Sequence, residues 1–323
     1  MAHHRVLAAA LLAFCMLSPR PSAAAASLYL GIQGYEDCPD LALFDGPSDR
    51  VVASYCFQTR GIAAVHGLAL DPGGKLFLSA ATQDGQGSII TLGGGFEVPH
   101  ATSGGLMFPG DLAFGPDGNL YVIGMRSGGP WGILRYDGRT GSFLGSFIER
   151  GTSGLDRPLD LLFLGDSLLV SDVQGGILRY DAYTGAFVDT FVALGSGGLQ
   201  RASFMKQGLD GDLFVSDGFR GVLRYDGESG VFVETFLPAV GEGYKYLGDI
   251  AFGSDGDIYV DELTDTGGVV HYDSTTRTLV GYVSGSGSTA LVIAAPAIPE
   301  PSAWVLLLSG LAAVVGIARR RRL

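Results

Sequence analysis

The chain has 323 residues, of which 51 are glycine and only 17% are charged, and its formal net charge is −12 at pH 7. Six of the 21 basic residues and one of the 33 acidic residues lie in two terminal segments, so the part between these segments carries a net charge of −17. A surface this acidic repels nucleic acid and anionic lipid, which argues against a nucleic-acid partner. The glycine content favours many short strands joined by tight turns.

Residues 1–26 have the pattern of a signal peptide. A short basic stretch ending at Arg5 precedes an apolar run from Val6 to Leu17, and residues 22–26 offer the small side chains that signal peptidase needs. Two prolines after the apolar run would interrupt a helix leading into the fold, which disfavours a buried N-terminal helix. We therefore expect cleavage before Ser27 and export across the inner membrane.

Cys38 and Cys56 are the two cysteines that follow the leader. Export would place them in an oxidising compartment, where an even pair favours a disulfide. Closing this loop would stabilise the fold by roughly 3 kcal/mol in the loop-entropy model. Two free buried thiols are the alternative.

One six-residue motif recurs through the middle of the chain. Gly-Ile-Leu-Arg-Tyr-Asp at 132–137 returns at 176–181 and, as Gly-Val-Leu-Arg-Tyr-Asp, at 221–226, and a diverged copy ends at Asp273. The tyrosines lie 44, 45 and 47 residues apart. This interval is typical of one four-stranded propeller blade.

A second recurring motif lies upstream of each copy of the first. Asp111 to Phe114 leads through an Asp-Gly turn into Leu120 to Val122, and Asp249 to Phe252 leads through another into Ile258 to Val260. Asp-Gly between two apolar runs is a strong hairpin signal because the turn needs positive φ. Each repeat therefore reads as strand, Asp-Gly turn, strand, loop, Arg-Tyr-Asp strand, Thr-Gly turn and strand.

These repeats predict an all-β fold, a six-bladed β-propeller over residues 27–295. Five blades are expected to begin near His66, Gly110, Leu159, Ser203 and Gly248. The sixth is split, with three strands between residues 28 and 55 and its first strand, Thr289 to Ala294, brought round from the other end of the domain. This pairing would close the ring and leave no long sheet edge. The repeat resembles the NHL family of propellers, and the resemblance implies the fold more than an activity.

Residues that recur in every blade are expected to build the blade. We interpret Arg135, Arg179 and Arg224 as donors between strands or blades, with a ligand-binding basic ring as the alternative. Asp172 and Asp217 are expected to accept backbone hydrogen bonds. Turns are expected to begin at Asp137, Asp181, Asp226 and Asp273.

The positions that open the first strand of each blade would line the mouth of the central channel. Asp111, Asp160 and Asp249 stand there, and three carboxylates on one axis could bind Ca²⁺ through oxygen ligands. The alternative is solvated acids that cap strand starts. Gluconolactonase-like propellers, similar to this chain in architecture, use a Glu with Asn and Asp around Ca²⁺, and no Glu or Asn occupies a matching position here.

His66 opens a first strand beside the same channel. Propellers of the virginiamycin B lyase type need a general base such as His beside a metal, and His66 is the one histidine of the domain placed to work with nearby carboxylates. An ordinary hydrogen-bonding role for His66 is the alternative.

The C-terminal segment, residues 296–323, has three parts in order. A polar motif precedes an apolar run from Ala303 to Ala318, and a basic cluster follows. The motif is Pro299, Glu300 and Pro301, and the cluster is Arg319, Arg320, Arg321 and Arg322. The run is just long enough for a transmembrane helix, and the arginines would hold its end in the cytoplasm. The segment resembles the PEP-CTERM sorting signal of Gram-negative bacteria that make exopolysaccharide, which implies recognition and cleavage by an exosortase.

Together these features predict an exported protein, first anchored in the membrane and then located at the cell surface or in the extracellular matrix. We expect a binding or scaffolding propeller rather than an enzyme, with the export machinery and an extracellular polysaccharide or surface protein as partners. Trp131, Tyr183 and Tyr244 could stack on sugars. The alternative function is a metal-dependent lactonase or lyase at the channel mouth.

Overall fold

The computed structural model describes residues 27–32, 41–45, 50–55, 62–93, 96–101, 104–239, 246–253, 256–263, 268–282 and 288–294. All of them belong to one compact unit, Ala26–Ala295. Four predicted features lie outside these residues and stay predictions: the signal peptide, the Cys38–Cys56 disulfide, sugar stacking by Tyr244 and the transmembrane helix of the sorting tail. Within the described ranges no helix is long and apolar enough to cross a membrane.

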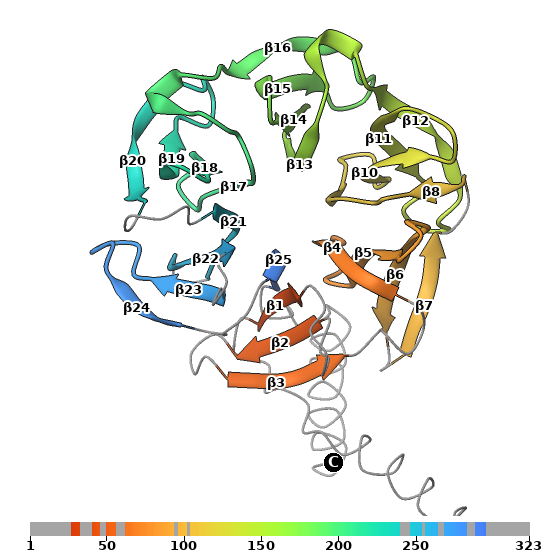
Figure 1. Ribbon diagram of the computed structural model, residues 1–323, viewed down its shortest axis with the longest axis horizontal. Helices are drawn as coiled ribbons and strands as arrows, with labels where there is room; N and C mark the ends of the chain where they lie inside the picture. Colours follow the sequence, from red (N-terminus) through yellow and green to blue (C-terminus); the bar gives the residue numbers. More distant parts are fainter. Residues whose placement is uncertain are drawn as a thin grey trace, which may run out of the picture. The chain divides into compact units, whose positions relative to one another are not determined.

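The described unit is an all-β propeller whose antiparallel sheets are arranged around a common centre (Figure 1). Five blades are built from consecutive strands. The first contains β4 (Ile62–Leu70), β5 (Leu76–Thr82), β6 (Gly87–Gly93) and β7 (Phe96–Ala101), and the second β8 (Leu106–Met107), β9 (Leu112–Phe114), β10 (Leu120–Arg126), β11 (Trp131–Tyr136) and β12 (Phe143–Glu149). The third contains β13 (Pro158–Leu164), β14 (Ser167–Asp172), β15 (Gly176–Asp181) and β16 (Phe187–Val192).

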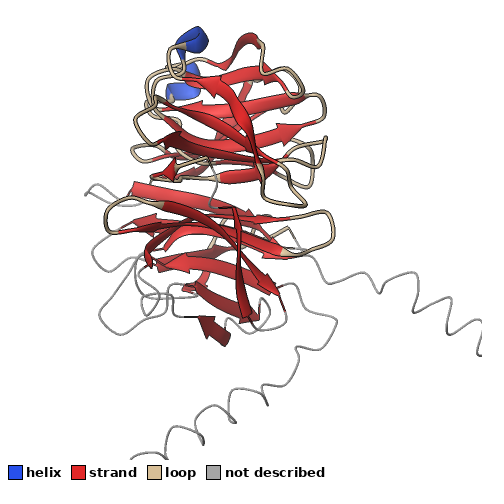
Figure 2. Ribbon diagram, turned by 90° about the vertical axis from the view of Figure 1, so that its right-hand side faces the viewer, coloured by secondary structure: helices blue, strands red, loops and turns tan. Residues whose placement is uncertain are grey.

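The fourth blade contains β17 (Met205–Gln207), β18 (Leu213–Asp217), β19 (Gly221–Tyr225) and β20 (Phe232–Pro238). The fifth contains β21 (Tyr246–Phe252), β22 (Ile258–Leu263), β23 (Gly268–Tyr272) and β24 (Leu279–Tyr282). The side view shows strands and loops almost throughout (Figure 2). The helices of the described part are two single 3-10 turns, η3 (Thr152–Gly154) and η4 (Ser196–Gly198).

A composite sheet joins the two ends of the unit. Its strand order is β25 (Ser288–Ala294), β1 (Ser27–Ile32), β2 (Leu41–Asp45) and β3 (Arg50–Tyr55). β25 runs antiparallel to β1, with Ser27 opposite Ala294 and Gly31 opposite Ala290. This is the pairing predicted for the split blade. The predicted count of six blades is corrected to five, because the sheet predicted as the split sixth blade is assembled from both ends of the chain and does not repeat the pattern of consecutive strands.

The recurring tyrosines build the interior of the blades. Tyr136, Tyr180 and Tyr225 are fully buried. Each tyrosine ring packs edge to face against the phenylalanine at the start of the next strand. The ring centroids of the three pairs lie 5.4, 5.6 and 5.7 Å apart. Burial raises the pKa of Tyr136 and of Tyr180 to about 12, so both phenols stay neutral. Such aromatic pairs contribute about 1 kcal/mol each beyond the area that they bury.

The recurring aspartates have the local roles predicted for them. The Asp181 carboxylate accepts hydrogen bonds from the amide and the hydroxyl of Thr184, and the same turn recurs at Asp137, Asp226 and Asp273. Asp172 Oδ2 accepts from two amides of the loop before β13, and Asp217 Oδ2 accepts from two before β17. These buried carboxylates satisfy backbone donors that the sheet leaves unpaired.

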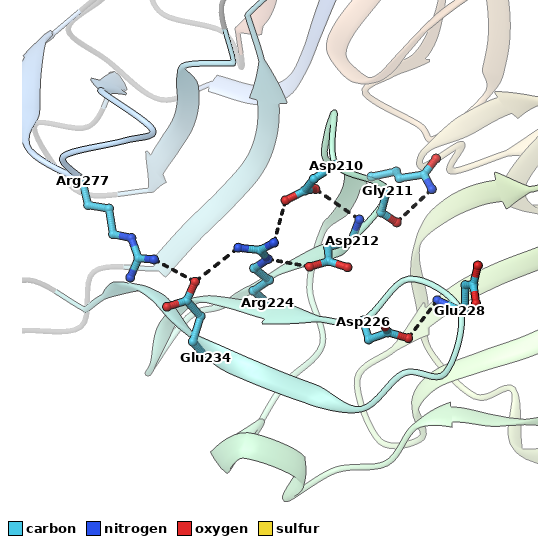
Figure 3. Close-up of polar contacts among 9 residues, drawn as sticks. Asp210, Gly211, Asp212, Arg224, Asp226, Glu228, Glu234 and Arg277 are labelled. Atoms are coloured by element: carbon cyan, nitrogen blue, oxygen red, sulfur yellow. Dashed lines mark hydrogen bonds and ion pairs between the residues drawn. The ribbon is translucent and has the colours of Figure 1, made fainter.

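The predicted arginine contacts are confirmed for Arg179 and Arg224. Arg179 forms an ion pair with Asp189 on the neighbouring strand of its blade. Arg224 binds Asp210, Asp212 and Glu234, and Glu234 in turn binds Arg277 of the next blade (Figure 3). Through Glu234 this network links β20 to the turn before β24. The guanidinium group of Arg224 therefore has a structural role.

Candidate functional site at the centre of the ring

Four charged side chains come from the innermost strands of consecutive blades. Asp111 directly precedes β9, Asp160 lies in β13, Lys206 in β17 and Asp249 in β21. β13, β17 and β21 face the centre of the ring (Figure 1), and β9 contacts the inner strands β4 and β13 on either side. The structure thus brings the three predicted carboxylates into one electrostatic group and adds Lys206, which the prediction missed. We call these four residues the central cluster.

Two of the carboxylates connect neighbouring blades. Asp111 Oδ2 accepts a hydrogen bond from the amide of Leu161, at 3.1 Å, and Asp160 Oδ2 accepts one from the amide of Met205, at 2.6 Å. In both cases the donor lies on the inner strand of the following blade. Asp160 is 1% exposed, so its bond to the amide of Met205 is made away from water, where a lost partner is costly.

Lys206 stands at a position where the other blades have alanine or leucine. Phe204, two residues earlier, occupies the place that Asp111, Asp160 and Asp249 hold in their blades. The fourth blade therefore replaces a carboxylate by an ammonium group two residues further on, on the same side of the strand. Lys206 Nζ lies 3.7 Å from Asp249 Oδ1, and the lysine side chain is 28% exposed.

The charges of the central cluster depend on one another. Burial raises the pKa of Asp111, and burial together with the charge of Asp111 raises the pKa of Asp160 well above its usual range. Both shifts favour the neutral, protonated carboxyl groups, because burial away from water disfavours the charged forms. Burial alone would lower the pKa of Lys206, but the charges of Asp249, Asp160 and Asp111 raise it, so the amine is an ammonium ion.

This arrangement resembles an internal ion pair more than a calcium site. Ca²⁺ takes six to eight oxygen ligands in proteins. Here the oxygens of Asp111 and Asp160 accept amide hydrogen bonds, and Asp249 faces the Lys206 ammonium group. Within the described residues, no group of three or more His, Cys, Asp and Glu side chains has the geometry to hold a metal ion. The calcium site at Asp111, Asp160 and Asp249 stays an untested prediction.

His66 lies in β4 beside a shift of register between Val65 and Gly67. Its side chain is partly buried, and burial lowers its pKa, which favours the neutral imidazole that a general base requires. The next residue, Gly67, packs so closely on the second blade that a Cβ there would lie 2.8 Å from the Cα of Asp111. Glycine is thus needed at position 67 for this contact between blades. The catalytic role of His66 stays a prediction.

Comparisons with known proteins identify the tail and the fold. Residues 297–322 match the PEP-CTERM protein-sorting motif, which implies an exported protein that an exosortase processes and that is anchored in the membrane beforehand. No curated protein matches the chain at a significant level.

Three solved structures that are similar to this chain are distant from it in sequence. A protein of unknown function from Bacteroides caccae has a TM-score of 0.60 at 15% identity, over 84% of this chain and 99% of that one. A gluconolactonase from Xanthomonas campestris has a TM-score of 0.52 at 16% identity, over 72% and 83%. A dihydro-heme d1 dehydrogenase has a TM-score of 0.51 at 14% identity, over 84% and 76%. Since proteins this different share the architecture, the likeness establishes the fold and no activity. The chain is a β-propeller that carries a PEP-CTERM sorting motif at residues 297–322.

Proposed function

We propose that this chain is an exported binding or scaffolding propeller, with repeats of the NHL type. In this proposal an exosortase processes the tail at Pro299, Glu300 and Pro301, and the propeller then acts at the cell surface or in the extracellular matrix of a Gram-negative bacterium. The match of residues 297–322 to the sorting motif is the observation that carries the proposal. The rigid ring supports it, because propellers present loop surfaces that bind partners without catalytic groups.

A metal-dependent lactonase or lyase at the channel mouth is the alternative, with His66 as its base. The fold likeness to a gluconolactonase does not favour it, because at 16% identity only the architecture is shared. The contacts of the central cluster support the binding proposal instead. Its buried carboxyl groups bond to the neighbouring blades and to Lys206, where they hold the ring together.

Replacing Glu300 by glutamine is expected to trap the precursor in the membrane. The change keeps the size of the side chain and removes the carboxylate that a processing enzyme would read, whereas the apolar run and the arginines that anchor the chain are unchanged. Fractionation of cells that express each form should place the wild type at the surface or in the matrix and the variant, with its full mass, in the inner membrane. Equal distribution of the two forms would show that the tail is a plain anchor.

A further inference from the structure

An exposed aromatic side chain lies at the junction of the first two blades in a conformation that its sequence disfavours. Phe108 has φ of 46°, in the left-handed region, although a bulky residue avoids that region and a residue before proline is normally extended. Its ring is nevertheless 47% exposed. Strain held at an exposed position is typical of functional sites, because the surrounding structure must maintain it.

Two contacts hold the Phe108 backbone and ring in place. The Phe108 amide donates a hydrogen bond to the carbonyl oxygen of Gly85, at 2.8 Å, in the loop between β5 and β6 of the preceding blade. A Cβ on Gly85 would lie 2.2 Å from a ring carbon of Phe108, and Gly85 has a φ of 82°, so a side chain there would displace the ring and strain the backbone. The ring is thus fixed over the neighbouring blade and turned partly to solvent.

Trp131 extends this surface. The rings of Phe108 and Trp131 lie 6.4 Å apart between centroids at an interplanar angle of 26°. Trp131 begins β11, where its backbone pairs with Met125 and its carbonyl oxygen accepts a hydrogen bond from the amide of Arg150. Both rings are therefore carried by ordered backbone, and the Trp131 ring, which is partly buried against the core between the second and third blades, lies at a small angle to the exposed ring of Phe108. We call this pair the aromatic platform.

Polar side chains border the aromatic platform. Asp84 and Gln86 flank Gly85 and are exposed, and Gln86 Nε2 donates to Asp84 Oδ2 at 3.1 Å. The hydroxyl of Thr82 donates to the other carboxylate oxygen of Asp84, and this bond lowers the pKa of Asp84, which stays an ionised acceptor. An apolar face beside an amide and a carboxylate matches a sugar ring, whose axial C–H groups pack on aromatic faces while its hydroxyl groups hydrogen-bond at the edge.

We propose that the aromatic platform, bordered by Asp84 and Gln86, binds an uncharged polysaccharide chain. This inference rests on the proposed binding function and names its ligand class. The charge of the domain selects among polysaccharides, since a net charge of −17 repels polyanions. The site requires no metal and no residue of the central cluster.

Affinity gel electrophoresis of the full chain in detergent tests the proposal, with galactomannan, xyloglucan and mixed-linkage β-glucan as uncharged polymers and alginate as a polyanion. At least one uncharged polymer should retard the wild type, and alginate should not. Phe108→Ala and Trp131→Ala should each weaken the retardation about tenfold, as expected for loss of one stacking contact. Tyr282→Ala, which removes a 66% exposed ring from the outer strand β24, is the matched control and should bind like the wild type.

A glycine variant separates binding from folding. Phe108→Gly removes the ring and relieves the strain, so it should melt at a higher temperature than Phe108→Ala and yet bind as weakly. If the wild type binds a polymer and Phe108→Ala and Trp131→Ala bind it equally well, the aromatic platform is not the binding site, while the proposed binding function stands. If no uncharged polymer retards the wild type, the proposed ligand class is wrong, and processing of the tail, measured separately with Glu300→Gln, is unaffected.

Discussion

Replacing Lys206 by methionine is expected to lower the free energy of unfolding by about 3 kcal/mol at neutral pH, because it leaves buried carboxylates without their countercharge. Asp249, 3.7 Å from the ammonium group, is 6% exposed at its side chain, and Asp160 is 1% exposed. Urea denaturation of the wild type and the variant measures the effect. Lys75→Met is the matched control, since Lys75 is exposed, and its loss should change the stability by less than about 1 kcal/mol.

The cost of Lys206→Met is expected to depend on pH. A carboxyl group whose pKa is raised in the folded protein binds more protons folded than unfolded, so the unfolding free energy falls as pH rises from the ordinary aspartate pKa, about 3.9, to the raised value. Without the ammonium group the carboxyl pKa values rise further, and acid then restores part of the lost stability. The variant should therefore be closer to the wild type near about pH 4 than near about pH 7. An equal loss at both values would show that the lysine acts by packing alone.

Removing β25 is expected to lower the thermal midpoint by about 10 °C or more, because it opens the ring. β25 is the inner strand of the composite sheet and pairs with β1 from Ser27 to Ile32. It also contacts β4 and β21, the inner strands on either side. Its loss would expose the edge of β1 and uncover apolar surface of two other blades.

Two chains with different ends measure this effect by calorimetry. One ends after residue 284 and lacks β25, and the other ends after residue 294 and lacks only the sequence beyond it. The longer chain should melt like the full protein and the shorter one well below it. Equal midpoints for the two chains would contradict the closure of the ring through β25.

The repeats made most of this fold predictable from the sequence. Arg-Tyr-Asp and Asp-Gly units specify strands and turns by local rules, and each copy confirms the others, so the blade pattern and the partner of β25 follow from alignment of the repeats. The number of blades was overestimated by one, because the composite sheet was counted as a split sixth blade although its strands are divided between the two ends of the domain.

Asp111, Asp160 and Asp249 were predictable because each opens the first strand of its blade, whereas Lys206 was missed. Lys206 stands where other blades have alanine or leucine, so the same comparison that set aside the recurring arginines could have found it. Phe108 carried no such signal. The proline after it predicts an extended backbone. Its left-handed conformation depends on the hydrogen bond from its amide to the carbonyl oxygen of Gly85, a contact between blades that the local sequence does not predict.

Metal content of the purified full-length protein is the most direct test of the central claim, that this is a binding propeller whose central cluster is closed by its own lysine. Elemental analysis after dialysis against calcium-containing buffer, with calcium titration by calorimetry, should find no stoichiometric divalent ion in the wild type. The Lys206→Met variant, whose central carboxylates lack the ammonium countercharge, should bind calcium more tightly than the wild type. One tightly bound calcium ion per wild-type chain, lost in Asp249→Asn, would contradict the account and favour the lactonase or lyase instead.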